Sequence, residues 1–253
     1  MTDPITLDFP SESICIFKMH DDDSKNALSG TFVESAIEKV KAIQENKALK
    51  VVILKGLEDI FCSGAAKVDL MKLCDGDTNV KDLVLSEMVM DIPVPVIAAM
   101  EGGAVGGGLV LGLCADIIIL AERSMYGGGF SDLGFTPGMG FTRLLKGLVG
   151  EYVANEMIFA GTLHKGKTFS NRGCVNYILP KAEVFKKATI LAEIIAEKPR
   201  VTLEVLKYSM SMDKRKQLLE ARVHEDMMHK ITFNQPGIKD IINARYAEKS
   251  NSK

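Results

Sequence analysis

A dense glycine cluster, with five glycines between Gly102 and Gly108, constrains this chain more than any other part of its sequence. An apolar segment that predicts a strand, residues 94–99, runs into the cluster, and an apolar segment of helical length, residues 107–115, leaves it. Glycine lets the backbone turn sharply and brings amide groups close to a ligand that a Cβ would block. Because the first amides of a helix lack intrahelical acceptors, such a turn can hold an anion or an oxygen that becomes anionic during a reaction.

The known phosphate-binding glycine motifs do not fit this cluster. The dinucleotide fingerprint G-x-G-x-x-G fails because Gly106 and Gly108 are followed by Leu111 where a third glycine is needed. The phosphate loop G-x4-G-K-S/T fails because Leu109 follows Gly108 where a lysine is required. Tight backbone packing explains clustered glycines as well as an anion site does, so both interpretations stay open at this point.

Composition places the chain among ordinary globular proteins. Its 253 residues suffice for one large domain or two small ones, and a hydrophobic content of 47% supports a sizeable core. The net charge of −2 gives no reason to expect nucleic acid or an anionic membrane as a partner. The longest apolar run is interrupted by Asp116 and is shorter than a bilayer span. Five scattered cysteines without a C-x-x-C pair, and a start without a signal-like segment, predict reduced thiols and a cytoplasmic location.

The hydrophobic pattern along the chain predicts alternating strands and helices, then a helical C-terminal region. Residues 51–54 form a wholly apolar strand candidate, which indicates a sheet covered on both faces. Strands are predicted at 5–9, 13–19, 51–54, 92–99, 117–120 and 174–179. Helices are predicted at 29–46, 80–90, 107–115, 141–148, 152–159, 185–196, 203–212, 216–231 and 237–246.

Five spaced motifs together carry a family resemblance. They are Phe-Cys-Ser-Gly-Ala-Ala at 61–66, Val-Ile-Ala-Ala at 96–99, the triple glycine at 106–108, Cys-Ala-Asp-Ile at 114–117 and Gly-Phe-Thr-Pro-Gly-Met-Gly at 134–140. In this combination the chain closely resembles the crotonase (enoyl-CoA hydratase/isomerase) superfamily, and the resemblance covers nearly its whole length.

The resemblance implies an α/β architecture, a crotonase-like fold of repeated ββα units with a helical C-terminal region. By that analogy, residues 1–195 form the ββα spiral core and residues 196–253 form a C-terminal helical trimerisation region. The implied assembly is a homotrimer or a dimer of trimers.

The resemblance also implies a substrate class and a site. Family members bind acyl thioesters of coenzyme A or of an acyl carrier protein's phosphopantetheine, with no other cofactor and no metal. Two backbone amides hold the thioester oxygen, and by motif position these belong to Ala65 and Gly107. The remaining expected substrate contacts are Lys25, Ala27 and Leu28 near the pantetheine and nucleotide, together with Gly64, Ala66, Lys67, Gly106, Phe130 and Asp132. For Lys25, a solvated surface lysine is the alternative interpretation.

Two positions depart from the hydratase pattern. Hydratases of the family carry a pair of glutamates where this chain has Val110 and Phe130. Water addition needs paired acid and base groups near the β-carbon, and apolar side chains cannot serve. The sequence therefore argues against ordinary hydration.

The chain most resembles the decarboxylating members of polyketide β-branching cassettes. The segment 134–140 carries this resemblance, together with Met228, His229 and Ile-Thr-Phe at 231–233. Those enzymes take a glutaconyl-type thioester on an acyl carrier protein and release its distal carboxyl as CO₂. The resemblance implies that His229 is a catalytic residue, while a packing role on a helix is the alternative.

One departure from the decarboxylase pattern leaves the reaction open. The subgroup uses a lysine at a position that is Asn79 here, and either Lys67 or Lys81 could replace it. Without carboxylate binding, the same apparatus would suit a double-bond isomerase in which His229 moves a proton between the α and γ carbons. A catalytically idle homologue that serves as an assembly partner is the third interpretation.

Overall fold

The structure is a computed structural model that describes residues 3–77, 84–171 and 175–251. A six-stranded sheet has the order β1-β2-β3-β5-β7-β10, and β1 is its antiparallel strand while the others run parallel. Its strands are β1 (Ile5–Ser11), β2 (Ile14–Met19), β3 (Val51–Lys55), β5 (Val96–Met100), β7 (Ile117–Ala121) and β10 (Tyr177–Leu179). The second sheet contains β4 (Ile60–Cys62), β6 (Gly103–Val105), β8 (Met125–Gly127) and β9 (Leu163–Lys165).

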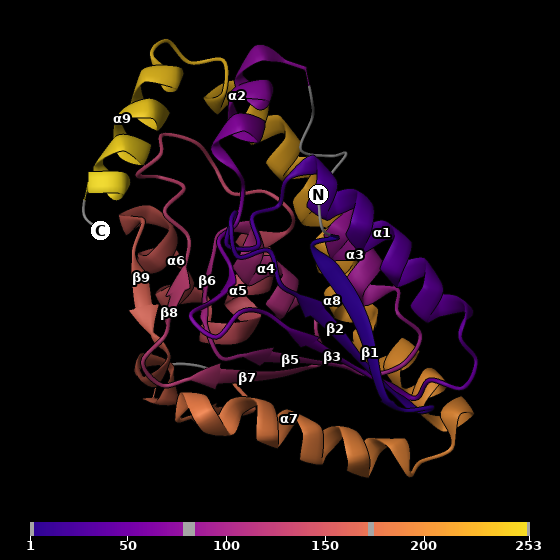
Figure 1. The fold of residues 1–253 in the computed structure, drawn as a ribbon. Helices are drawn as coiled ribbons and strands as arrows, with labels where there is room; N and C mark the ends of the chain where they lie inside the picture. The colour runs from indigo at the N-terminus through magenta and orange to yellow at the C-terminus, as the bar shows by residue number, and fades with distance from the viewer. Residues whose placement is uncertain (1–2, 78–83, 172–174, 252–253) are drawn as a thin grey trace.

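Helices cover the large sheet on both faces (Figure 1). On one face α7 (Lys181–Ala196) packs along the sheet, where Val51 and Ile53 of β3 meet its buried side chains. On the other face Val52 and Leu54 join the main core. That core includes helices α1 (Gly30–Glu45), α3 (Leu85–Met90), α4 (Gly107–Leu113), α5 (Phe141–Val149) and α6 (Glu151–Ala160). The apolar strand at 51–54 is therefore buried on both faces, as predicted.

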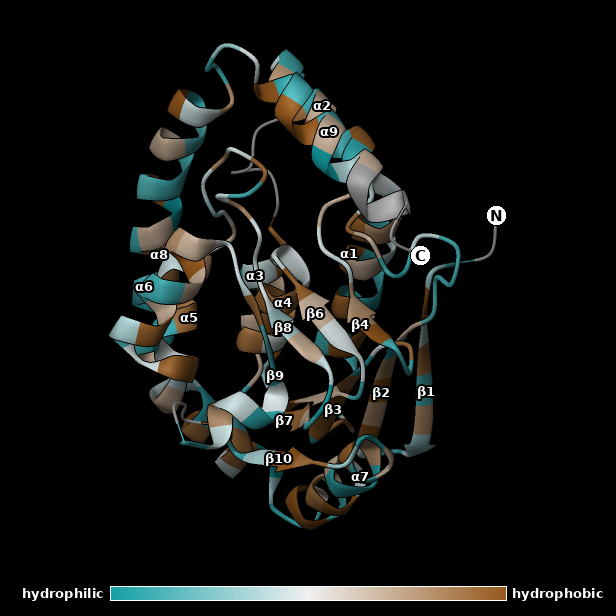
Figure 2. Ribbon diagram, turned by 90° about the vertical axis from the view of Figure 1, so that its left-hand side faces the viewer, coloured by the Kyte–Doolittle hydropathy of each residue, from teal (hydrophilic) through white to brown (hydrophobic). Residues whose placement is uncertain are grey.

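The first long helix shows how local sequence sets an element's bounds. Ser29 is the N-cap of α1, and its hydroxyl accepts a hydrogen bond from the Phe32 N–H. The helix ends at Glu45 with Asn46 as the C-cap, which confirms the bounds predicted from the 3.6-residue period. The hydropathy colouring in Figure 2 shows apolar residues concentrated on strands and on the inner faces of helices.

The C-terminal region is one 33-residue helix, α8 (Arg200–Thr232), followed by α9 (Ile238–Asn251). The prediction of two helices at 203–212 and 216–231 was wrong, because the residues between them are polar without being helix breakers. Lys214 lies in that stretch, and its Nζ donates to the carbonyls of Leu113 and Ala115, so the polar interval docks on the end of α4. Helix α9 packs on α2 (Lys67–Asp75), on the far side of the molecule from α7 (Figure 1).

Several predictions concern residues that lie partly or wholly outside the described ranges. Asn79 and Lys81 lie outside them, as does the beginning of the helix predicted at 80–90, of which α3 forms the last part. The predicted strand at 174–179 corresponds to β10, which begins at Tyr177.

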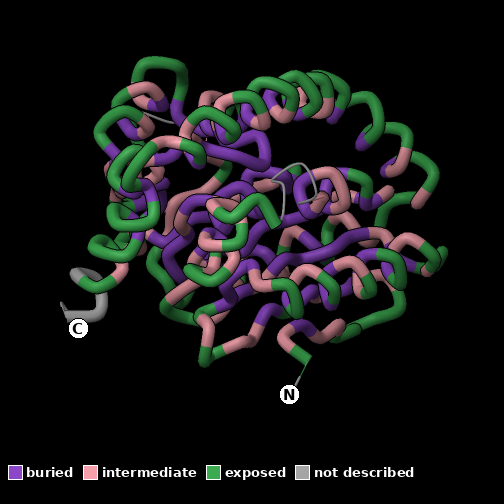
Figure 3. Tube along the Cα trace, turned by 90° about the horizontal axis from the view of Figure 1, so that it is seen from above, coloured by how far each residue is buried: buried purple, intermediate pink, exposed green. Residues whose placement is uncertain are grey.

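Figure 3 shows the buried residues gathered in the centre and the exposed residues on the outer helices. Across the described residues, no helix combines the length and apolar character needed to cross a membrane.

Candidate active site

Two turns at the same edge of the small sheet form the centre of the site. Strands β4 and β6 pair in parallel, so their carboxyl ends lie side by side. The chain leaves β4 through Gly64 and Ala65 into α2, and it leaves β6 through Gly106 into α4. Because ligand sites in parallel sheets form at the carboxyl ends of strands, this edge is the expected place for one.

The two turns are in close contact because Gly64 has no side chain. Its φ of +86° is in the left-handed region, and a Cβ there would lie 2.5 Å from the Val105 carbonyl oxygen. The same Cβ position is 3.6 Å from the Gly107 nitrogen, which places the start of α4 beside the turn that carries Ala65. Neither the Ala65 N–H nor the Gly107 N–H donates a hydrogen bond to any group in the described part of the chain. Two adjacent amide donors are thus left for a ligand.

The rest of the glycine cluster has a packing role. Gly106 has φ of +55° and donates its N–H to the Gly127 carbonyl at 2.8 Å. A Cβ on Gly108 would lie 2.3 Å from the Cys62 carbonyl oxygen, so α4 can pack on β4 only with glycine at this position. The packing interpretation of the cluster is therefore confirmed, and the anion-site interpretation stays a prediction.

A buried asparagine fixes the first turn. Asn26 is 0% exposed, and its side-chain N–H groups donate to the carbonyls of Met19 at 3.2 Å and Phe61 at 3.0 Å. Its side-chain oxygen accepts from the Asp21 N–H at 2.8 Å. With φ of +54° it occupies the left-handed region, which asparagine tolerates better than most residues. Asn26 thereby joins the end of β2 to β4, immediately before the turn that carries Ala65.

The backbone beside Asn26 continues this connection along the turn. The Ser63 N–H donates to the Lys25 carbonyl at 3.1 Å, and the Leu28 N–H donates to the Gly64 carbonyl at 2.8 Å. On the other side of the turn, the Tyr246 hydroxyl of α9 donates to the Ala65 carbonyl at 3.1 Å. The peptide group that contains the Ala65 N–H is therefore held by Leu28 through its Gly64 carbonyl, and the next peptide group is held by Tyr246.

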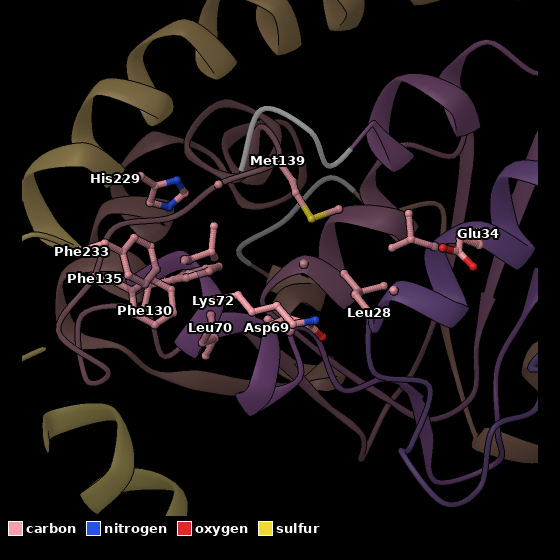
Figure 4. Close-up of a pocket in the computed structure, with 16 residues that line it drawn as sticks. Leu28, Glu34, Asp69, Leu70, Lys72, Phe130, Phe135, Met139, His229 and Phe233 are labelled. Atoms are coloured by element: carbon pink, nitrogen blue, oxygen red, sulfur yellow. The ribbon is translucent and has the colours of Figure 1, made fainter. Parts of the chain in front are cut away.

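An apolar cavity of about 300 Å³ opens over the two amides (Figure 4). Figure 4 shows His229 with Phe130, Phe135 and Phe233 on one side, and Leu28 with Glu34 on the other. Charged groups in its wall are Glu34, Asp69 and Lys72. A cavity with apolar walls and a few convergent polar groups is the usual form of a small-molecule site.

His229 has one ring nitrogen engaged and one free. Its Nε2 lies 2.6 Å from the Thr136 carbonyl oxygen, which can only accept, so Nε2 carries a proton. Its Nδ1 is buried without a hydrogen-bond partner among the described residues. Burial lowers the pKa of His229 below its usual range, while the Thr136 carbonyl and Asp226 act in the opposite direction. Burial therefore favours the neutral ring, in which the lone pair lies on Nδ1 because Nε2 carries the proton.

A second buried residue on α8, Glu225, holds the wall opposite the amides. Its carboxylate accepts from the Gly140 N–H at 2.7 Å, the Thr142 N–H at 3.0 Å and the Thr142 hydroxyl at 2.7 Å. These contacts cap the start of α5, directly after Met139, which lines the cavity. Burial raises the pKa of Glu225, and the three donors act in the opposite direction. Together, Glu225 and His229 attach one face of α8 to the segment 136–142.

The cavity brings together part of the predicted site. Ala65, Gly107 and His229 line it, as do Leu28 and Phe130. Ala27 and Gly64 are buried beside the first turn, Gly106 precedes α4, and Ala66 caps α2. Lys25, Lys67 and Asp132 are exposed and do not line it.

Sequence reasoning missed Lys72, which does line the cavity and forms a 2.9 Å ion pair with Asp69. The helical spacing of Asp69, Lys72 and Leu73 places the three on one face of α2, and that signal could have found the lysine. Of the two positions where hydratases carry glutamate, Phe130 is in the wall and Val110 is fully buried in the core.

The chain is similar to known proteins over most of its length. Residues 10–253 match the family model described as enoyl-CoA hydratase/isomerase. The bacillaene synthase decarboxylase PksI of Bacillus subtilis is 38% identical over 229 residues, which cover 90% of this chain and 92% of PksI.

Two solved structures are similar over nearly the whole chain. One comes from a dehydratase/decarboxylase enzyme couple involved in polyketide beta-branching, with a TM-score of 0.91 and 37% identity over 95% of this chain and 98% of the other. The second is the ECH2 decarboxylase domain of CurF from Lyngbya majuscula, with a TM-score of 0.89 and 33% identity over 96% of this chain and 100% of that domain.

Replacing Asn26 with Asp tests the connection that fixes the first turn. Asn26→Asp removes both side-chain donors and places an oxygen against the Met19 and Phe61 carbonyls, so we expect a loss of about 3 kcal/mol in the free energy of unfolding. Urea unfolding measures it. The matched control is Asn46→Asp, because the Asn46 side chain accepts from the Ala48 N–H and a carboxylate can do the same. Equal effects of the two changes would contradict the role given to Asn26.

Proposed function

The chain belongs to the enoyl-CoA hydratase/isomerase family, and we propose that it decarboxylates a glutaconyl-type thioester carried on an acyl carrier protein. The observation that carries the proposal is that Ala65 and Gly107, whose amides have no acceptor in the described part of the chain, line an apolar cavity that also contains His229. Its relatives support the reaction type, since PksI and the CurF ECH2 domain are decarboxylases. Because related enzymes act in polyketide beta-branching, we propose a protein carrier rather than free coenzyme A.

The thioester carbonyl is the electron sink for loss of CO₂, and the two amides stabilise the negative charge that it receives. When the bond between the γ-carbon and the carboxylate breaks, its electron pair forms a double bond between the γ and β carbons. The former α,β pair moves to the bond between the α-carbon and the carbonyl carbon, and negative charge arrives on the thioester oxygen. Fixed donors at Ala65 and Gly107 stabilise that dienolate oxygen more than the ground-state carbonyl, and this difference lowers the barrier.

His229 is the proton donor that completes the reaction. With Nε2 held by Thr136, Nδ1 is the ring nitrogen that can exchange a proton with the acyl chain. An anionic substrate beside the ring favours its protonated form, so a proton is taken up on Nδ1 when substrate binds. The imidazolium then returns that proton to carbon of the dienolate.

Lys72 is the cation in the cavity wall that can pair with the substrate's distal carboxylate. It is joined to Asp69 across one turn of α2 at 2.9 Å, and its side chain is 47% exposed. A surface pair of this kind is weak, so the ammonium can exchange Asp69 for a substrate carboxylate at small cost. This assignment takes the place of the expectation for Lys67, which does not line the cavity.

Isomerisation of an enoyl thioester is the second candidate, and one observation favours it. The neutral His229 ring has its lone pair on Nδ1, which is the form that a base needs to remove a γ-proton. Hydration has no such support, because the apolar Phe130 and the core residue Val110 take the places of both catalytic carboxylates.

We further propose that the protein is a homotrimer or a dimer of trimers, assembled through α8. This helix exposes large apolar side chains at helical spacing: Val201, Val205, Tyr208, Met212, Leu219, Val223, Met227 and Ile231. An exposed apolar stripe on a helix surface, here interrupted between Met212 and Leu219, marks a protein–protein contact.

A reducing cytoplasm is the proposed location. The described cysteines are all free thiols, and burial raises the pKa of Cys15, Cys62 and Cys114 to about 12. Thiols with so high a pKa do not form the reactive thiolate, which suits a structural role in the core.

Deleting one amide donor tests the oxyanion site. Gly107→Pro removes the N–H at the first position of α4, where proline is tolerated, and Gly107→Ala is the matched control that adds a Cβ but keeps the donor. In either variant the Cβ meets the flexible tips of Leu28 and Met139. We expect the proline variant to turn over roughly 10²–10³-fold more slowly than the alanine variant in a CO₂-release assay. Equal rates for the two would remove Gly107 from the oxyanion site.

The pH profile separates decarboxylase from isomerase. If His229 acts as an acid, kcat/KM for CO₂ release falls as pH rises through the free enzyme's His229 pKa, which lies below its usual value of 6.5. If His229 acts as a base in an isomerase, kcat/KM rises through the same range and no CO₂ is lost. His229→Gln should abolish this pH dependence of kcat/KM in either case. A His229→Gln variant that keeps the same pH dependence would contradict the assignment.

The mass in solution tests the assembly. We expect light scattering to give three or six times the 27.6 kDa chain mass. Val223→Glu places a charge in the middle of the apolar stripe and should shift the mass toward one chain, because burying an unpaired carboxylate is unfavourable. A wild-type monomer would refute the proposal.

A further inference from the structure

One peptide group in the wall of the cavity is held at both ends by buried side chains. The Ser86 hydroxyl of α3 donates to the Met139 carbonyl at 2.8 Å. At the other end of the same peptide group, the Gly140 N–H donates to the Glu225 carboxylate of α8 at 2.7 Å. Both side chains are buried, so water does not compete for either hydrogen bond. The bond between Met139 and Gly140 is therefore fixed by two helices that are distant from it in the sequence.

Met139 also has a backbone conformation that few side chains adopt. Its φ is +63°, in the left-handed region, which is uncommon for a residue other than glycine. Such a conformation persists only where the surrounding structure enforces it, and residues of this kind cluster at active sites and ligand contacts. The hydrogen bonds to Ser86 and Glu225 enforce it here, and the Met139 side chain lines the cavity as a result.

The Met139 thioether lies directly against Gly107. A Cβ on Gly107 would be 2.9 Å from the Met139 sulfur and 2.7 Å from a Leu28 methyl group. Figure 4 shows Met139 between two groups of cavity residues, with His229 and the aromatic side chains on one side and Leu28 on the other. A substrate whose thioester oxygen is held by the Gly107 amide therefore has the Met139 side chain beside its carbonyl group and its α-carbon.

The proposed function gives the two arms of the substrate different exits. Because His229 donates the proton, the acyl arm with its β and γ carbons lies on the His229 side. The sulfur arm, which leads to the phosphopantetheine, then leaves on the Leu28 side. Met139 stands where the two arms meet, so the α-carbon lies next to the thioether and the γ-carbon lies nearer to the His229 ring.

We propose that Met139 shields the α-carbon of the dienolate, so that His229 protonates the intermediate at its γ-carbon, and that Ser86 is the positioning residue that keeps the thioether in place. The inference rests on the proposed function, in which loss of CO₂ leaves a dienolate whose oxygen is held by the two amides. It adds the position of the double bond in the product, which then lies between the α and β carbons.

The two carbons that can accept the proton give different products. At the γ-carbon, the electron pair between the β and γ carbons forms the new C–H bond. The pair between the α-carbon and the carbonyl carbon then moves to the α,β bond, and the charge on oxygen restores the carbonyl. At the α-carbon, the pair shared with the carbonyl carbon forms the C–H bond, the carbonyl is again restored, and the β,γ double bond remains.

Water is the competing proton donor at the α-carbon. Exclusion of water from a closed site prevents unwanted proton transfer to a reactive intermediate. Met139 is 5% exposed, and it occupies the space through which a water molecule would reach the α-carbon beside Gly107. In Met139→Ala that space is open, and the dienolate oxygen and the Gly107 peptide supply polar partners for a water molecule there. Such a water gives its proton to the α-carbon and leaves as hydroxide.

Truncation of Met139 tests the shield, with the product ratio as the readout. The substrate is a methyl-branched glutaconyl thioester on an acyl carrier protein, and NMR measures the ratio of the β,γ product to the α,β product during initial turnover. Met139→Leu keeps a side chain of similar volume. Met157→Ala is the matched control, because Met157 is fully buried on α6 and does not line the cavity. The ratio comes only from active molecules, so partial unfolding of a variant does not change it.

We expect Met139→Ala to raise the ratio of β,γ to α,β product by at least about tenfold, since the lost contact of the thioether is worth roughly that factor. Met139→Leu and Met157→Ala should keep the wild-type ratio. A wild-type enzyme that forms mainly the β,γ product would overturn the proposal. An unchanged ratio in Met139→Ala, or an equal rise in Met157→Ala, would overturn it as well.

Ser86→Ala tests the positioning role. It removes the hydroxyl that holds the Met139 carbonyl, and we expect the ratio to rise in the same direction by about threefold, which corresponds to the loss of one neutral hydrogen bond. The matched control is Ser35→Ala, because the Ser35 hydroxyl of α1 is also buried but bonds to Asp3 away from the cavity. A wild-type ratio in Ser86→Ala would contradict the positioning role of Ser86.

Failure of this inference is separable from failure of the proposed function. If the wild-type enzyme releases CO₂ but Met139→Ala leaves the product ratio unchanged, the shield is wrong and the decarboxylase assignment stands. If the wild-type enzyme releases no CO₂ from the substrate, the decarboxylase assignment is wrong and the role of Met139 falls with it.

Discussion

The proposed site depends on two backbone N–H groups, those of Ala65 and Gly107, whose turns are in close contact and which have no acceptor among the described residues. Here the parallel pairing of β4 with β6 brings two chain turns to one edge, and Gly64 and Gly108 allow contact distances that a Cβ would forbid. Ala65 and Gly107 therefore both line the cavity, and in the proposed function their amides hold the substrate oxygen.

The surrounding structure holds each side of the cavity by a separate buried side chain. Asn26 connects β2 to β4 on the oxyanion side, while Glu225 caps α5 on the opposite side. Glu225 and His229 are one turn apart on α8, so the helix that fixes the wall also places the His229 ring in the cavity. Rigid placement matters because a fixed donor stabilises developing charge without having to reorganise during the reaction.

The sequence predicted the elements that local chemistry determines. The period of α1 with its Ser29 cap, the buried strand at 51–54 and the glycine turn all appear in the structure. It also indicated two turns whose residues Ala65 and Gly107 line one cavity, because the motifs around them are local. The unbroken length of α8 was not predicted, since its polar middle is stabilised by docking onto α4.

The residues that sequence reasoning missed act across long separations in the chain. Asn26 reaches Phe61, and Glu225 reaches Gly140 and Thr142, through hydrogen bonds that no sequence period reveals. Lys72 is a different case, because its ion pair with Asp69 is local. The helical spacing of Asp69 and Lys72 could have identified Lys72, but the prediction followed the motif positions and named Lys67.

Isotope-edited infrared spectroscopy of a bound, non-reactive thioester tests the central claim most directly. A substrate analogue that lacks the distal carboxylate and carries a ¹³C-labelled thioester carbonyl would report the hydrogen bonds to its oxygen. The account predicts a carbonyl stretch that moves to lower frequency on binding, with the shift partly lost in Gly107→Pro and kept in Gly107→Ala. A bound carbonyl that absorbs at its frequency in water would contradict it, because the two amides would then not converge on that oxygen.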